Sequence, residues 1–93
     1  MPITVHVPGY LCDVTGGRSM VALEATPATV GEALLALAAL HPGVRDRVMN
    51  EQGQVQSQVN VFVGRQSIIH TGGLRTPLGD GAELYILPAL SAG

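Results

Sequence analysis

The sequence has no lysine and no run of charge of one sign. Its five basic residues are all arginines spread along 93 residues, and the formal net charge is −2. Proteins that bind nucleic acid or anionic membranes usually gather Lys and Arg on one surface. We therefore expect neither nucleic acid nor a membrane surface among the partners of this protein.

Cysteine and metal-binding residues are also scarce. Cys12 is the only cysteine, which excludes a disulfide within the chain and fits a reducing cytoplasm or a small buried side chain. A catalytic thiol needs a neighbouring base, and none is evident from the sequence. The histidines His6, His41 and His70 lack the spacing of metal ligands. Without paired carboxylates either, we expect no metal site, no bound cofactor and no self-contained enzyme.

Long apolar runs are absent too. No stretch is long enough to span a bilayer, and the N-terminal residues 1–7 lack the basic region and apolar run of a signal peptide. The length predicts a single domain with a modest core. These observations favour the cytoplasm as the location.

What the sequence does contain is the alternation of apolar and polar residues that is typical of half-buried strands. It predicts strands at 3–7, 18–24, 59–63, 67–70 and 83–87, with a long loop at 8–14. Thr-Gly-Gly occurs at 15–17 and again at 71–73. Neither copy opens a helix or carries a lysine, so both are interpreted as turns and not as phosphate-binding loops.

One helix is predicted between the second and third strands. Thr29 is its expected N-cap, with Glu32 completing a capping box, and the helix runs from Val30 to about Leu40. A short turn is expected at 44–49, with Val44 and Val48 inward, followed by an exposed loop at 50–58. Strands and one crossover helix in this order predict an α+β fold, a mixed sheet with one helix across it.

The last predicted strand leads into a tail of small residues, Pro88-Ala89-Leu90-Ser91-Ala92-Gly93. Alternation places Leu84 and Ile86 toward the helix, and Tyr85 and Leu87 on the other face. Phe62 on another strand has the same outward parity. An exposed apolar cluster beside the tail predicts a partner site. The alternative is that another segment, such as the Asn50–Gln58 loop, covers this face.

The order of elements and the C-terminal block resemble a known family. The resemblance is strongest in Val59-Asn60-Val61-Phe62-Val63, in residues 74–84 and in Ile86-Leu87-Pro88-Ala89-Leu90. These stretches are similar to the MoaD/ThiS family of ubiquitin-like sulfur carriers, closest to its cysteine-biosynthesis branch. The resemblance implies a β-grasp fold with four or five strands, a domain at 1–87 and a flexible tail at 88–93.

The resemblance also implies a chemistry for the tail. Gly93 would be adenylated by an E1-like partner enzyme that uses ATP, and then converted to a thiocarboxylate that donates sulfur for cysteine, molybdopterin or a related product. The chain would act as a carrier, monomeric when free, and bind partners through Phe62, Tyr85, Leu87, Pro88, Leu90 and Ala92. The family ends in Gly-Gly, whereas this chain ends in Ala92-Gly93. Alternatives are a ubiquitin-like protein modifier, a non-catalytic interaction module, and the small subunit of molybdopterin synthase.

Overall fold

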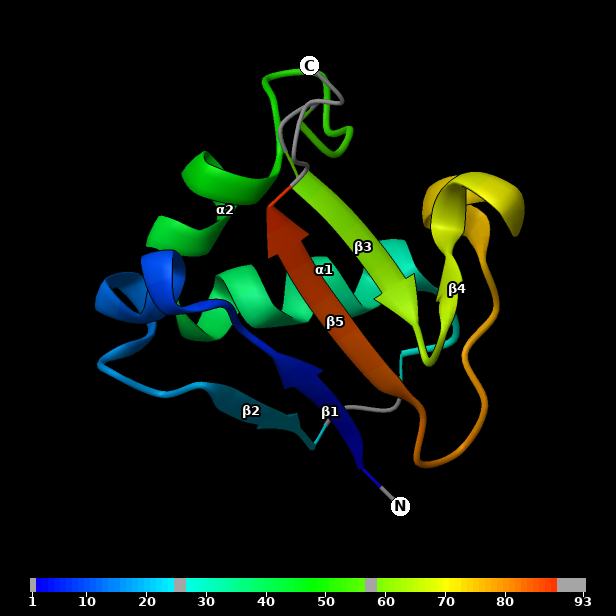
Figure 1. Ribbon diagram of the computed structural model, residues 1–93, viewed down its shortest axis with the longest axis horizontal. Helices are drawn as coiled ribbons and strands as arrows, with labels where there is room; N and C mark the ends of the chain where they lie inside the picture. The colour runs from blue at the N-terminus through cyan, green and yellow to red at the C-terminus, as the bar shows by residue number, and fades with distance from the viewer. Residues whose placement is uncertain (1, 25–26, 57–58, 89–93) are drawn as a thin grey trace.

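The protein is a five-stranded sheet with one main helix across one of its faces (Figure 1). The computed structural model describes residues 2–24, 27–56 and 59–88. None of the helices in these ranges is long and apolar enough to cross a membrane. The elements follow the chain as β1 (Ile3–His6), η1 (Gly9–Thr15), β2 (Met20–Leu23), α1 (Val30–Leu40), α2 (Gly43–Val48), β3 (Val59–Val63), β4 (Gln66–Ser67), η2 (Ile68–His70), η3 (Gly73–Arg75) and β5 (Glu83–Pro88).

The sheet order is β2-β1-β5-β3-β4. The two strands nearest the chain ends, β1 and β5, are parallel neighbours, and every other adjacent pair is antiparallel. A mixed sheet of this order with a helix across it is the β-grasp fold, as the resemblance implied. The last strand therefore lies in the middle of the sheet.

The helix α1 has the predicted bounds and the predicted N-cap, Thr29, whereas the Glu32 side chain contacts the Thr29 hydroxyl and not the backbone N–H that a capping box uses. The Thr29 hydroxyl accepts a hydrogen bond from the Glu32 backbone N–H at 3.3 Å, and the Glu32 carboxylate lies 3.3 Å from the same hydroxyl. This satisfies one of the free N–H groups at the helix start. The buried stripe comprises Val30, Ala33, Leu34 and Leu37.

Strand alternation supplies the other half of the core. Ile3 and Val5 of β1, Val59 and Val61 of β3, and Leu84 and Ile86 of β5 are all buried against the helix layer. Val44 and Val48 of α2 are buried as predicted. The predicted inward parity of the three main strands is thus confirmed.

The predicted loop at 8–14 is wrong, because the chain forms the 3-10 helix η1 there. Leu11 is fully buried, and the buried Thr15 hydroxyl donates to the Arg18 carbonyl at 2.7 Å. The second strand is also shorter than the predicted 18–24, since β2 begins only at Met20. The turn signal at 15–17 is confirmed, with Gly16 and Gly17 both at positive φ.

The predicted strand at 67–70 is likewise wrong over most of its length. Only Gln66 and Ser67 pair with β3, and the chain then turns into η2. The Ser67 side chain accepts a hydrogen bond from the Ile69 N–H, which favours the turn over an extended backbone. Ile68 remains buried, so the apolar signal was genuine and only the element type differed.

Candidate functional site

The candidate site is the face of the sheet that points away from α1, together with the end of β5. Leu84 and Ile86 hold β5 to the core and are 0 % and 1 % exposed. The residues between and after them, Tyr85 and Leu87, point to the opposite face. Leu87 is 42 % exposed and Tyr85 is partly buried. The alternation of the sequence therefore correctly predicts the buried pair, Leu84 and Ile86, and the outward pair, Tyr85 and Leu87.

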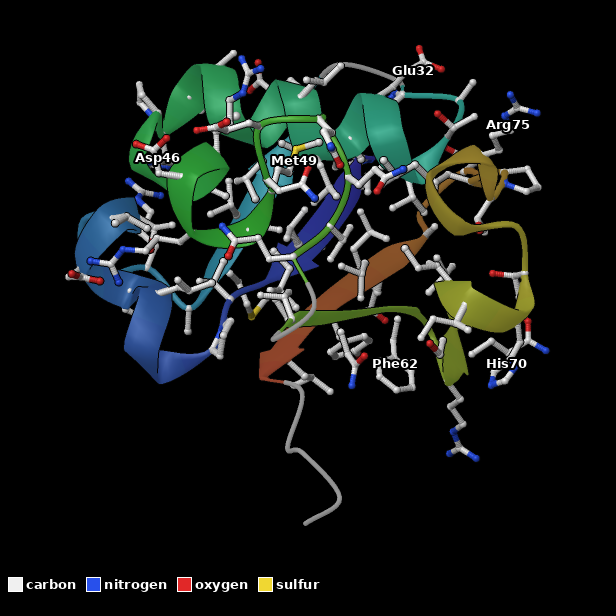
Figure 2. All side chains as sticks on the ribbon, turned by 90° about the horizontal axis from the view of Figure 1, so that it is seen from above. Glu32, Asp46, Met49, Phe62, His70 and Arg75 are labelled. Carbon is white, nitrogen blue, oxygen red and sulfur yellow. The ribbon has the colours of Figure 1, made fainter. Side chains whose placement is uncertain are left out.

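Phe62 and Tyr85 are direct register partners in the antiparallel pair β3–β5, and Asn60 lies opposite Leu87. Side chains opposite each other in such a pair lie about 5 Å apart at Cβ and interact. Figure 2 shows Phe62 pointing away from the helix layer, on the side of the sheet opposite Met49 and Asp46. The three predicted aromatic and apolar residues thus form one cluster.

Pro88 is the last residue of β5, opposite Val59 in register, although the sequence assigned it to the tail. The Gly64 N–H donates to the Glu83 carbonyl at 3.0 Å. In an antiparallel ladder the bonded residues alternate, so Glu83, Tyr85 and Leu87 direct their backbone groups toward β3. The Pro88 nitrogen points the other way, beyond the stretch paired with β1. Proline therefore ends this strand without removing a ladder bond.

A histidine from β1 completes the cluster. His6 is the register partner of Tyr85, and its imidazole stacks on the Tyr85 ring with centroids 4.2 Å apart and planes at 6°. The His6 Nε2 atom lies 2.8 Å from a Glu83 carboxylate oxygen. The carboxylate thus holds the imidazole while the imidazole supports the phenol ring.

The registers of all four strand pairs align these residues in one row across the sheet. The row runs Met20, His6, Tyr85, Phe62, Ser67, with one residue from each strand. Met20 is 56 % exposed. We refer to Phe62, Tyr85, Leu87 and His6 as the outer-face cluster.

The alternative, that the loop after α2 covers this face, is not what the described residues show. Gln56 donates its backbone N–H to Val48 and its side-chain amide to Asp46 and Met49. Val55 lies against the core. This stretch is held to α2, on the helix side of the sheet, and leaves the outer-face cluster open; residues 57 and 58 lie outside the description.

The remaining predicted site residues, Leu90, Ala92 and the reactive Gly93, lie outside the described residues, so their roles stay predictions. Sequence reasoning missed His6 and Glu83. Their outward parity was visible, because His6 alternates with Val5 and Val7. What the sequence does not disclose is that β1 lies beside β5 and brings His6 onto Tyr85.

Other reactive groups offer no second site in the described part of the chain. The Cys12 sulfur contacts the backbone carbonyls of Pro8 and Arg18, at 3.6 and 3.5 Å. No group of three or more His, Cys, Asp or Glu residues is placed there to hold a metal ion. The outer-face cluster and the end of β5 therefore remain the candidate site.

A β-grasp domain that presents an apolar face beside its C-terminal strand defines the ubiquitin-like class of carrier and modifier proteins. The family model described as the ThiS family matches residues 5–93. The chain belongs to the ThiS family.

Curated relatives include both carriers and modifiers. The chain is 34% identical over 95 aligned residues to the sulfur carrier protein CysO of Mycobacterium tuberculosis (strain ATCC 25618 / H37Rv), with 100% of each chain covered. It is 35% identical over 83 residues to small archaeal modifier protein 1 of Haloferax volcanii, covering 89% of this chain and 91% of the relative.

Solved structures that are similar to this chain likewise include a carrier and a modifier. The structure of the Amycolatopsis orientalis BexX/CysO complex contains a chain with a TM-score of 0.86 and 35% identity, covering 98% of this chain and 99% of that one. The crystal structure of SAMP1 from Haloferax volcanii has a TM-score of 0.81 and 28% identity, with 100% of both chains covered.

Proposed function

We propose that this protein is a sulfur carrier whose terminal residue, Gly93, is the group that reacts. The supporting observation is the outer-face cluster, which lies directly beside the end of β5 and so at the root of the tail. Full-length similarity to a protein named as a sulfur carrier supports the same role. In this role the chain is a substrate of its partners and not a catalyst.

The proposed chemistry has two steps. A carboxylate oxygen of Gly93 attacks the α-phosphorus of ATP in a partner enzyme, releasing pyrophosphate and forming an acyl adenylate. A sulfide nucleophile then attacks the carbonyl carbon and expels AMP, which leaves a thiocarboxylate. Neither step changes an oxidation state when sulfide is the donor. Glycine suits the reacting position because no side chain hinders its carboxyl carbon.

The tail is long enough to extend from the domain into the active site of a partner enzyme. From Pro88 to Gly93 an extended chain spans about 20 Å at roughly 3.3 Å per residue. We propose that an E1-like adenylating enzyme docks on Phe62, Tyr85 and Leu87 while Leu90, Ala92 and Gly93 enter its active site. ATP would be bound by that enzyme. A second, biosynthetic enzyme would then accept the sulfur, with cysteine as the favoured product because of the similarity to CysO.

The test is the intact mass of the protein after incubation with the adenylating enzyme, ATP and sulfide. We expect an increase equal to the exchange of one oxygen for one sulfur. Deletion of Gly93 should abolish it, and omission of ATP is the matched control. An unchanged mass with an enzyme that thiocarboxylates its own carrier would contradict the proposal. We place the reaction in the cytoplasm, as the single Cys12 suggested.

A second candidate is a ubiquitin-like modifier, which the similarity to small archaeal modifier proteins favours. Gly93 would then form an amide with a lysine of another protein. Chains of the protein on itself through lysine are excluded, because the sequence contains none. Recovery of lysine-linked conjugates from cells, lost on deletion of Gly93, would favour this role. Stable co-purification with a larger catalytic subunit would instead favour the small subunit of molybdopterin synthase.

A further inference from the structure

The outer edge of β2 is an open strand edge beside an apolar helix surface. β2 is the terminal strand of the sheet, and its only strand partner in the described chain is β1. The Val7 N–H donates to the Ser19 carbonyl at 2.8 Å, so alternate residues Ser19, Val21 and Leu23 face β1. The backbone groups of Met20 and Ala22 therefore face outward.

These outward groups have no hydrogen-bond partner among residues 2–24, 27–56 and 59–88. Two donors and two acceptors thus stand in a row on an extended backbone. Exposed edges are usually protected by lysine, by proline or by very short strands. The stretch Ser19–Glu24 has neither residue, whereas the opposite edge strand, β4, has only two residues before the chain turns away.

The surface next to this edge is apolar. A groove between β2 and α1 is lined by Ala22, Leu23, Glu24, Ala36, Ala39 and Leu40. Leu40, the last residue of α1, is 58 % exposed in this groove. Together with Met20, this makes two of the five large hydrophobic side chains that the described residues expose, and both flank this edge.

From this geometry we infer that the protein self-associates through β2, in a two-fold antiparallel pair with a second copy of the chain. A register centred on Val21 places Met20 opposite Ala22 of the partner subunit, and Ala22 opposite Met20 of the partner subunit. All four outward groups of each copy are then used, which gives four hydrogen bonds. A shift of the register by two residues in either direction places Met20 opposite Met20 of the partner subunit, or Ala22 opposite Ala22 of the partner subunit. Part of the four hydrogen bonds is then lost.

The same register also matches side chains. Met20 and Ala22 share the outer face, so a large side chain lies opposite a small one on both sides of the axis. If the pairing continues by two residues in each direction, Arg18 of each copy lies opposite Glu24 of the partner subunit, which gives two such pairs. On the helix side, the exposed Leu40 of α1 lies in the groove beside β2. A two-fold interface requires such self-complementarity.

The proposed dimer is independent of the sulfur-carrier role and compatible with it. β1 separates β2 from β5, so the outer-face cluster and the tail root stay accessible in both copies. One short strand pair is small compared with stable interfaces, so we expect reversible association. This proposal replaces the expectation of a free monomer.

Sedimentation equilibrium over a wide concentration range tests the inference. The average mass should rise from 9.6 kDa toward twice that value. Ala22→Pro removes a donor that faces outward and is not used within the subunit, so it should stay monomeric and folded. Amide exchange at Met20 and Ala22 in the unaltered protein should slow with concentration, while that of exposed loop amides should not. A constant mass of one chain, or exchange independent of concentration, would overturn the proposal.

Charge exchange tests the register. Arg18→Glu and Glu24→Arg each replace two attractive pairs with two repulsive ones, and should weaken self-association about tenfold. An equimolar mixture of the two variants restores both pairs and should form the mixed dimer, as should the double variant with itself. Arg75→Glu, an exposed arginine away from β2, is the matched control. Failure of the mixture to associate, when the unaltered protein does, would exclude this register.

Discussion

The imidazole of His6 lies face to face with the phenol ring of Tyr85, at 4.2 Å and 6°, although 78 residues separate them in sequence order. The parallel pairing of β1 with β5 creates this contact, and a Glu83 carboxylate oxygen lies 2.8 Å from the imidazole Nε2 atom. The stack gives the outer-face cluster an ordered centre.

The first prediction concerns that centre. Tyr85→Ala should weaken binding of the adenylating enzyme by tenfold or more, because aromatic side chains at the middle of an apolar patch dominate binding energy. Isothermal titration calorimetry with the partner enzyme measures this. Ile69→Ala removes a more exposed apolar side chain, from η2, that is not part of the outer-face cluster, and it should leave the affinity nearly unchanged. Equal losses for the two variants would place the interface elsewhere.

The second prediction separates stacking from hydrogen bonding at His6. His6→Phe keeps an aromatic ring against Tyr85 but loses the contact with Glu83, and should reduce partner affinity less than His6→Ala does. We expect about a twofold to threefold loss for Phe and fivefold for Ala, in line with an aromatic pair worth about 1 kcal/mol. The two dissociation constants, measured with the same partner, provide the comparison. Equal losses for Phe and Ala would show that the contact with Glu83, and not the stacking, carries the effect.

The third prediction contrasts the two faces of β5. Ile86→Ala should lower the free energy of unfolding by about 2–5 kcal/mol, since it removes a fully buried side chain from the core. Leu87→Ala, one residue later and exposed, should cost less than about 1 kcal/mol while weakening partner binding. Urea unfolding followed by circular dichroism measures both. Similar destabilisation by the two variants would contradict the assigned parity.

A fourth prediction tests the start of α1. Thr29→Ala removes the hydroxyl that accepts from Glu32 and should cost about 1 kcal/mol in unfolding free energy. Thr29→Ser retains that oxygen and serves as the control, with stability close to the unaltered protein. If both substitutions cost the same, the methyl group of Thr29, and not its cap, carries the effect.

The fifth prediction concerns the residue before the proposed reacting group. Ala92→Gly gives the Gly-Gly ending of the family and should raise the rate of adenylation, because it removes a methyl group from the segment that we propose enters a narrow channel to the active site of the adenylating enzyme. Ala92→Val should lower that rate in proportion to its bulk. ATP–pyrophosphate exchange with the partner enzyme measures both rates. Equal rates for Gly, Ala and Val would show that the channel does not contact this side chain.

Local signals predicted much of this molecule. The apolar spacing and the Thr29 cap located α1, and alternation assigned the two faces of β3 and β5. The 3-10 helices η1 and η2 were missed because they involve short-range hydrogen bonds that alternation does not reveal, from the Thr15 hydroxyl at the end of η1 and to the Ser67 side chain at the start of η2. The register between β1 and β5 was beyond reach, because it joins the two ends of the chain. The His6–Tyr85 stack depends on that register.

The parallel pairing of β1 and β5 also has a mechanical consequence. β1 starts and β5 ends at opposite ends of the sheet (Figure 1). A force that draws the tail away from the N-terminus would therefore slide the two strands along each other. Sliding loads their hydrogen bonds together, whereas peeling would break them one at a time. A partner could pull on the tail during threading or release without unravelling the domain from which it extends.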